Sequence, residues 1–474
     1  MEIDWKAVFI TLALWICAQA IPYNLYAPDL QGKYCEARPK GCCPGRQDGC
    51  AAPILGTLCY CDDFCNRTSN DDCCPDFWSH CKGIPRPPED TRSCYYQGRY
   101  FNHGQKFKVN CKECMCKAMN GFMDILCETQ ECLVEEEVIS QINQNSREFG
   151  WRASNYSEFW GKRLDEGLAK RLGTLHSKKK VLQMKPIKMK YDPNALPQSF
   201  DARTHWPGLI SPPIDQTSNC AASWALTTAA IASDRFAVMT RRPHVLAPQH
   251  LLSCNFRNQQ GCNGGHLTRA WIFIAKFGLV PESCYPWVGA QTECRVPKKK
   301  KLLLTQCPQA KDFHQSPHTP LFRVGPVYKL KTENDIMHDI MTSGPVQATM
   351  KVSREFFLYN NGVYHCSNTL SRSRTGYHSV RIVGWGNEIN PITNREEKFW
   401  IVANSWGPSW GEGGYFRIRK GTSECEIESF VIAAWAAPSD VNELIYAGKY
   451  DIESIVQHAH RNTTEMRNDL MRRK

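Results

Sequence analysis

Cysteine is the residue that most limits what this chain can fold into. Of its 25 cysteines, 16 lie between Cys35 and Cys132 and only eight between Cys220 and Cys425. A segment so dense in cysteine and so poor in apolar residues is stabilised mainly by disulfides. The longer segment has sparse cysteines and long apolar runs, so it can bury a core of its own. We therefore predict small disulfide-rich modules at the N-terminus, followed by one large domain.

Residues 1–20 predict a secretory signal peptide. The run from Ala7 to Cys17 is apolar, and Ala18-Gln19-Ala20 is a small-x-small cleavage site. A signal anchor is the alternative, but this run is shorter than the roughly 20 residues of a membrane span. Cleavage removes Cys17 and leaves 24 cysteines, an even number that favours complete pairing in an oxidising compartment. We expect a secreted chain that does not span a membrane.

Glycosylation signals and charge agree with an extracellular location. The sequence has Asn-x-Ser/Thr sequons at Asn66, Asn155 and Asn462. The formal net charge is +11, which favours anionic partners such as sulfated glycans. The densest basic runs are Lys178–Lys180 and Lys298–Lys301, and most runs of this kind are merely solvated loops. Nothing in the sequence resembles a nucleic-acid-binding module.

The first cysteine-rich stretch, residues 35–81, matches a known module. It holds ten cysteines, including a C-x-C-x3-C run from Cys59 to Cys65 and the Cys73-Cys74 pair. This pattern resembles a somatomedin B domain, which usually has eight cysteines and serves as a binding module. The two additional cysteines leave the disulfide connectivity open.

The second stretch, residues 94–132, resembles part of a von Willebrand factor C-type module. It holds six cysteines, among them the C-x2-C-x-C run from Cys111 to Cys116. The same spacing could bind zinc. No histidine follows at ligand spacing and the compartment is oxidising, so we favour disulfides and predict no metal site. The Pro-rich residues 82–93 are the expected linker before this module.

The composition of the chain changes at Leu196. Residues 133–195 lack cysteine, and their aromatic side chains recur at roughly helical spacing, which predicts one or two helices before an extended lead-in. A helical half followed by a strand-rich half predicts an α+β architecture with two subdomains over residues 196–436. Residues 437–474 form a polar tail. The expected long helix lies at 224–240, and the expected strands lie at 380–386, 399–405 and 415–418.

The large domain contains four separated motifs: Asp215–Trp224, Cys262–Gly265, Gly376–Gly386 and Ala403–Phe416. Together they resemble the motifs of papain-family cysteine proteases, and most closely those of cathepsin B. They occur in the family's order over about 240 residues. The resemblance implies the papain fold, with a helical subdomain and a β-barrel-like subdomain. It also identifies residues 133–195 as propeptide-like, through Trp151-Arg152-Ala153.

In this family a cysteine thiolate at a helix N-terminus attacks the peptide, aided by the helix dipole and a histidine. An asparagine orients the histidine, and a glutamine binds the oxyanion. The resemblance assigns these roles to His378, Asn404 and Gln216, but the nucleophile position is Ser223. A serine hydroxyl cannot form the thiolate–imidazolium pair, and Asn404 is neutral where serine triads use a carboxylate. We therefore predict an inactive domain that uses no cofactor.

Further differences from the family weaken the case for catalysis. Gln216 lies one residue further from Cys220 than is usual, which places its oxyanion role in question. The resemblance pairs Cys220 with Cys262 in a disulfide, so Cys220 is not a substitute nucleophile. Residues 288–320 contain no paired histidines of the kind cathepsin B uses to grip a substrate C-terminus. We do not predict carboxydipeptidase activity.

The combination of these modules with Ser223 resembles the tubulointerstitial nephritis antigen family, most tellingly at Cys220-Ala-Ala-Ser-Trp224. The resemblance implies a secreted, non-catalytic glycoprotein of the basement membrane and extracellular matrix. Such a protein would act in adhesion or scaffolding, with laminin-, collagen- or integrin-type partners.

Two other functions stay open. The domain could be a slow residual peptidase, or a decoy that binds peptides in competition with true cathepsins. Against a peptide-binding role, we favour the interpretation that His378 and Asn404 persist as a buried structural pair beneath Trp406. Residues 133–195 could be removed or retained, and if retained they would block the cleft.

Overall fold

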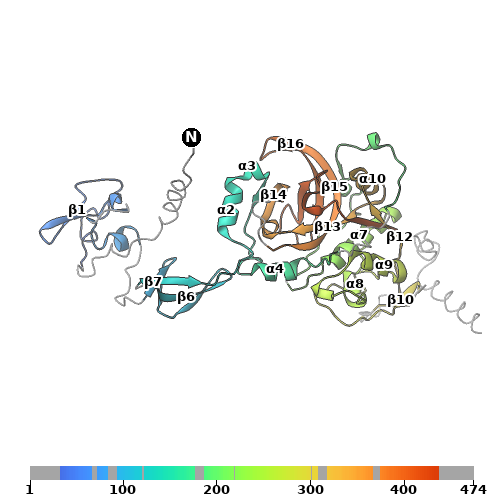
Figure 1. Ribbon diagram of the computed structural model, residues 1–474, viewed down its shortest axis with the longest axis horizontal. Coiled ribbons are helices and arrows are strands. Elements are labelled where there is room, and N and C mark those ends of the chain that lie inside the picture. The colour runs from blue at the N-terminus through green and yellow to red at the C-terminus, as the bar shows by residue number, and fades with distance from the viewer. Residues whose placement is uncertain are drawn as a thin grey trace, which may run out of the picture. The chain divides into compact units, whose positions relative to one another are not determined.

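The structure is a computed structural model that describes most of the chain from residue 32 to residue 436 (Figure 1). The chain divides into two compact units. The first holds the described residues up to Lys108 together with Glu113–Glu128, and the second holds Val109–Lys112 and the described residues from Thr129 onward. No described helix is long and apolar enough to cross a bilayer. The described residues are 32–66, 72–83, 93–119, 122–176, 186–217, 219–299, 302–307, 318–366 and 374–436.

Several sequence predictions fall outside these ranges. They are the signal peptide, the sequon at Asn462, the tail from residue 437, the basic run Lys178–Lys180 and most of the 82–93 linker.

The first cysteine-rich module has little regular structure and a core made largely of cystine. Strands β1 (Ala51–Ile54) and β2 (Thr57–Tyr60) form an antiparallel hairpin. Two single helical turns follow, η2 (Asp63–Asn66) and η3 (Phe77–Cys81), and the second buries Phe77 and Trp78 among the half-cystines. Four disulfides close the module: Cys35–Cys61, Cys42–Cys81, Cys43–Cys50 and Cys59–Cys74.

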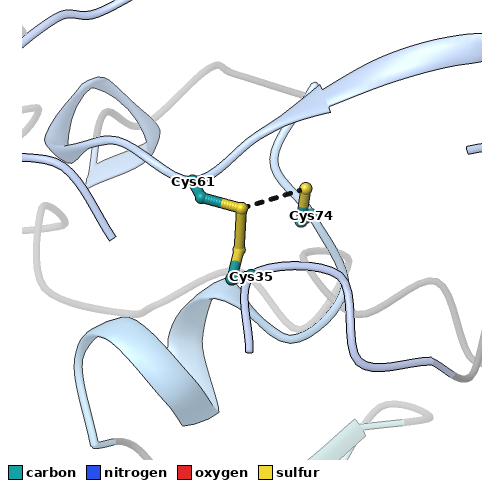
Figure 2. A group of neighbouring side chains, drawn as sticks. All are labelled: Cys35, Cys61 and Cys74. Carbon is teal, nitrogen blue, oxygen red and sulfur yellow. Dashed lines mark hydrogen bonds between the residues drawn. A yellow bond between two sulfur atoms is a disulfide. The ribbon is translucent and has the colours of Figure 1, made fainter. Parts of the chain in front are cut away.

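Two of these disulfides touch. Figure 2 shows the Cys35–Cys61 bridge with Cys74 beside it, and the Sγ atoms of Cys61 and Cys74 are 3.4 Å apart. The expectation that all cysteines after the signal peptide pair is wrong at Cys65 and Cys73. The Cys73 thiol donates to the carbonyl of Cys65 at 3.6 Å, and the Cys65 thiol donates to the carbonyl of Tyr60 at 3.4 Å.

The second cysteine-rich stretch consists of short antiparallel strands. Each cysteine of the C-x2-C-x-C run is in a disulfide, so the zinc alternative is left without a thiolate ligand there. The bonds are Cys94–Cys116, Cys111–Cys132 and Cys114–Cys127. The strands are β3 (Ser93–Tyr96), β4 (Arg99–Asn102), β5 (Lys106–Val109), β6 (Lys112–Met119) and β7 (Phe122–Cys127).

The predicted long helix forms as α7 (Ser223–Thr240), and helices α8 (Pro248–Cys254), α9 (Leu267–Phe277) and α10 (Glu333–Ser343) pack against it. Its alanines have high helix propensity and allow close approach of α8 and α9. It ends where Arg241 adopts a left-handed conformation, with φ of 56°. The other helices are α2 (Glu136–Gln144), α3 (Ser146–Phe149), α4 (Leu164–Arg171), α6 (Ala202–His205), α8 (Pro248–Cys254), α9 (Leu267–Phe277) and α10 (Glu333–Ser343), with single turns η4 (Pro193–Ala195), η5 (Gly261–Asn263), η6 (Arg354–Leu358) and η7 (Glu424–Glu426).

The strand-rich half forms one nine-stranded sheet in the order β12-β18-β13-β15-β16-β17-β14-β8, with β9 paired to β15. All these pairings are antiparallel except β14 with β17. The predicted strands at 380–386, 399–405 and 415–418 form the centre of this sheet. The strands are β8 (Trp151–Ala153), β9 (Phe200–Asp201), β12 (Val324–Leu330), β13 (Val346–Val352), β14 (Tyr359–Tyr364), β15 (Gly376–Asn390), β16 (Arg395–Ala403), β17 (Tyr415–Arg419) and β18 (Val431–Ala436); β10 (Leu304–Gln306) and β11 (His318–Pro320) form a separate pair.

Adjacent opposite charges on α7 connect the helical and strand-rich halves. Asp234 pairs with Arg381 of β15, and Arg235 pairs with Asp339 of α10. All four side chains are at most 3% exposed. A buried charge is tolerated only when it is paired and hydrogen-bonded, so these two ion pairs fix how α7 lies against both neighbours.

The propeptide-like segment is an integral part of the large unit. The predicted helices form as α2, α3 and α4, but its aromatic residues lie mostly outside them. Trp151 is in strand β8, and Phe159 is in the turn before α4. Both rings are fully buried in the same core as Trp406 of the papain-like domain. The helical reading of their spacing is therefore wrong, because β8 pairs with the distant strand β14.

Candidate functional site

Ser223 is the first residue of α7, at the end where the helix dipole is positive. Its side chain is fully buried. The hydroxyl lies 3.2 Å from the hydroxyl of Thr174 and accepts a hydrogen bond from the backbone N–H of Ser379 at 3.3 Å. Among the described residues, no hydrogen bond joins Ser223 to His378. The hydroxyl is thus held by groups that do not activate it for attack.

His378 lies on β15 and Asn404 directly follows β16, so the antiparallel pairing of these strands brings them together. The Nε2 atom of His378 and the Oδ1 atom of Asn404 are 2.8 Å apart. The ring of Trp406 lies 5.2 Å from the imidazole, centroid to centroid. Burial lowers the pKa of His378 to about 4, although Asn404 and the backbone of Leu172 oppose the shift. The imidazole is therefore neutral at physiological pH.

The amide of Gln216 is fully occupied. Its Nε2 donates to the carbonyls of Arg171, Lys170 and Cys220, the shortest of these at 2.9 Å. Its Oε1 accepts from the hydroxyl of Ser405 at 2.8 Å. An oxyanion donor must offer a free N–H to the reacting oxygen. In this structure the N–H groups of Gln216 are used by carbonyls of the chain itself.

The chain fills the site with its own residues 173–175. The backbone N–H of Thr174 donates to Tyr377 at 3.1 Å on the strand side. On the helical side, Leu175 donates to Gly265, and Gly265 donates to Gly173, both at 3.0 Å. Both walls of the site are therefore hydrogen-bonded to one extended segment, as they would be to a peptide.

Position 173 can only be glycine in this arrangement. Its φ is +105°, and a Cβ atom there would lie 2.1 Å from the carbonyl oxygen of Ala221. Such a contact is impossible for any side chain. Gly173 therefore permits the segment to lie directly against the loop that leads into α7.

Arg171 anchors the segment at its N-terminal side. Its guanidinium is buried, pairs with Glu158 and Asp215, and lies over the ring of Phe159 at 5.1 Å. Burial raises the pKa of the Glu158 carboxyl, and the charge of Arg171 opposes that rise. The arginine therefore both neutralises a half-buried carboxylate and ties the segment to the loop at Asp215.

The cysteines of the large unit supply no substitute nucleophile. Cys220 forms a disulfide with Cys262, with their Cα atoms 4.5 Å apart. Cys294 and Cys307, from the region where cathepsin B would carry its paired histidines, are likewise in disulfides. The remaining bridge of this unit's enzyme-like part joins Cys366 to Cys425.

Two of the predicted sequon residues lie in the described part of the chain. Asn155 is exposed in the loop after β8, and Asn66 is the last residue of η2.

The sequence motifs identify Ser223, His378, Asn404 and Gln216, but they do not identify the residues that fill the site. Arg171, Gly173 and Thr174 were only part of a propeptide-like stretch. The stretch Arg171-Leu-Gly-Thr-Leu175 has no periodicity and no reactive side chain. The single local signal was Gly173, since an isolated glycine can mark a close backbone approach.

Stability should fall with acid because of His378. Its folded pKa of about 4 is below the unfolded value of about 6.5. Between these values the unfolded chain binds a proton that the folded chain does not. Stability is therefore complete above about pH 6.5 and is lost as pH falls toward 4, by about 2 kcal/mol between pH 7 and pH 5.

This loss of stability is measured by urea unfolding of the parent and of a His378→Gln variant at pH 7 and at pH 5. The variant should lose about 2 kcal/mol less than the parent between pH 7 and pH 5. His250, whose pKa burial lowers to about 3, contributes equally to both proteins and cancels in the difference. Identical losses in parent and variant would refute the assignment to His378.

Comparisons with known proteins place this geometry in context. A family model described as papain family cysteine protease matches residues 196–435. Human "Tubulointerstitial nephritis antigen-like" is 42% identical over 424 residues, covering 86% of this chain and 89% of its own. Human "Tubulointerstitial nephritis antigen" is 38% identical, with 87% and 89% covered. Among solved structures, procathepsin B S9 from Trypanosoma congolense has a TM-score of 0.54 at 27% identity, covering 65% of this chain and 99% of its own.

Proposed function

This chain belongs to the papain family of cysteine proteases and, within it, to the tubulointerstitial nephritis antigen family; from that premise we propose that it is a secreted, non-catalytic protein of the extracellular matrix. It would act in adhesion or scaffolding rather than in proteolysis. The observation that carries the proposal is the state of Ser223, whose hydroxyl is held by Thr174 and Ser379 and not by His378.

The chemistry of the site supports the absence of catalysis. A serine needs a general base to remove its proton during attack. The imidazole of His378 is a weak base with a pKa of about 4. Its partner Asn404 carries no charge, and changing the carboxylate to an amide costs a serine protease about 10⁴ in turnover.

The filled site also argues against a peptide-binding decoy. Gly265 and Tyr377 already bond to residues 173–175, and the N–H groups of Gln216 are already used. A void beside Asn404 and Ser405 has a volume of only about 10 Å³, which is no more than one water needs. A competing peptide would first have to displace the chain's own segment.

Each part of the chain is assigned to a module. We assign residues 35–81 as somatomedin B-like, 94–132 as von Willebrand factor C-like, 133–195 as propeptide-like and 196–436 as papain-like. The cysteine-rich modules are the proposed binding parts. In the first of them the hairpin exposes Leu55 by 81% and Leu58 by 53%, and neighbouring exposed leucines offer apolar surface to a partner. Proposed partners are matrix proteins, and sulfated glycans drawn by the net charge of +11.

Deposition into matrix tests this function. The secreted parent should accumulate in the matrix left after cells are removed, and Ser223→Ala should accumulate equally, because no catalytic step is involved. A double variant, Leu55→Asn with Leu58→Ser, should lower the matrix-bound fraction about tenfold, since burying one leucine is worth about 1.5–3 kcal/mol. Asparagine at position 55 tolerates the observed positive φ of 47°.

Ile389→Ser is the matched control, because Ile389 is 64% exposed but lies in the papain-like domain. It should deposit like the parent. A parent found only in the medium, or a Ser223→Ala variant that fails to deposit, would contradict the proposal.

A further inference from the structure

A polar pocket lies where the propeptide-like segment meets the papain-like sheet. Its volume is about 510 Å³, within the range of about 300–1,000 Å³ typical of ligand sites. Strand β8 and its neighbour β14, paired in register at Arg152 and Asn361, contribute side by side to its lining, and α2 contributes Asn143. Helices α2 and α3, which Figure 1 labels, contact strand β8. The lining residues are Asn143, Arg152, Ala153, Ser154, Asn360 and Asn361, none of which is acidic.

Hydrogen bonds within the pocket fix its walls. The side-chain amide of Asn143 accepts from the backbone N–H of Ala153 at 2.9 Å and donates to the carbonyl of Ala153 at 3.0 Å. The Asn361 amide donates to Oδ1 of Asn360 at 2.6 Å. These bonds hold the side-chain amides of Asn143 and Asn361 in one orientation. The Oδ1 atoms of Asn143 and Asn360 can each accept one more hydrogen bond.

Other donors in the pocket are not used by the protein. Within the described part of the chain, the exposed guanidinium of Arg152 has no ion pair or hydrogen bond, and the hydroxyl of Ser154 has no partner. The pocket therefore combines fixed amides, a hydroxyl and a free guanidinium. Sugar hydroxyls and acetamido groups both donate and accept, so they match this mixture of groups.

The sequon residue Asn155 directly follows the pocket residue Ser154. Its side chain is exposed, as is Ser157, which completes the sequon. During secretion its amide nitrogen can displace the pyrophosphate of a lipid-linked oligosaccharide. The N–C bond to the first sugar forms, the sugar–oxygen bond to the pyrophosphate breaks, and the nitrogen loses one proton.

We propose that this pocket receives the first sugars of an N-linked glycan on Asn155. A covalently attached sugar needs little affinity, because its attachment gives an effective concentration in the millimolar range. A glycan seated there would contact residues 143 and 152–154 of the propeptide-like segment together with Asn360 and Asn361 of the sheet. It therefore clamps β8 onto β14.

This inference goes beyond the proposed function and does not depend on any matrix partner. It is tested on the full secreted chain by hydrogen exchange and mass spectrometry. Ser157→Ala removes the sequon, whereas Ser157→Thr keeps it and is the matched control. Arg152→Ala is introduced into both backgrounds, so that its effect on the glycan is separated from its effect on the strand.

The expected result has three parts. Asn155 carries a glycan in the parent and in Ser157→Thr. Amides of residues 151–154 and 359–363 exchange about tenfold faster in Ser157→Ala, because an unclamped edge strand opens more often. Arg152→Ala accelerates exchange only where the glycan is present. Unmodified Asn155, equal exchange in the two Ser157 variants, or an equal Arg152→Ala effect in both backgrounds would each overturn the proposal, whatever the outcome of the matrix test.

Discussion

The parent protein should hydrolyse none of a broad panel of fluorogenic peptides. Loss of a catalytic nucleophile costs on the order of 10⁶ in turnover, and here Ser223 is also hydrogen-bonded away from His378. The neutral, buried imidazole and its neutral partner Asn404 cannot compensate. Any signal from the purified chain should equal that of a His378→Ala variant, measured side by side at equal concentration.

Two variants separate the missing nucleophile from the filled site. Ser223→Cys alone should stay inactive, because residues 173–175 still occupy both walls of the site. Adding Gly173→Ala expels this segment, since a Cβ would meet the carbonyl of Ala221 at 2.1 Å. If the double variant then gains activity that His378→Ala abolishes, the scaffold is intact and is silenced both by the missing thiol and by the segment in the site. Activity in the parent that depends on His378 would overturn the non-catalytic reading.

Arg171→Met should destabilise the large unit by about 3–5 kcal/mol. Removing one partner of a buried ion pair leaves the other charge uncompensated. Arg171 is 3% exposed in its pairs with Glu158 and Asp215, and the substitution also removes its contact over the ring of Phe159. Chemical unfolding midpoints at pH 7 measure the loss, and exchange of the Thr174 and Leu175 amides reports whether the segment leaves the site.

Arg163→Met is the matched control from the same segment. Arg163 pairs with Asp165, but both side chains are about half exposed, and exposed pairs contribute about 0–1 kcal/mol. Its unfolding midpoint should be close to that of the parent. Equal losses for Arg171→Met and Arg163→Met would mean that the Arg171 network does not hold the segment.

The sequence predicted the parts of the fold whose signals are local. The alanine-rich pattern predicted α7 within one residue, and alternating apolar residues predicted β15, β16 and β17. The family motifs predicted the papain fold, which the family match at 196–435 confirms. By contrast, strand β8 has only three residues and forms because β14, some 200 residues later, offers an edge. No local pattern carries that information.

The candidate site likewise has some residues that the sequence reveals and others that it does not. Ser223, His378 and Asn404 stand in motifs and could be read directly from the chain. The partners that decide their state could not, because they are contributed by backbone groups. The carbonyl of Arg171 takes a hydrogen bond from Trp406, and the same carbonyl takes one from Gln216. Since every residue has a carbonyl, the sequence does not show which carbonyl accepts these hydrogen bonds.

The segment in the site is held largely through its main chain, at Gly173, Thr174 and Leu175. Hydrogen bonds of this kind do not depend on which side chain a residue carries. Substitutions can therefore accumulate at positions 174 and 175 without emptying the site, provided that position 173 remains glycine. Many neutral substitutions therefore leave the segment in the site. Restoring a working protease would require two changes together, a new nucleophile and removal of the segment.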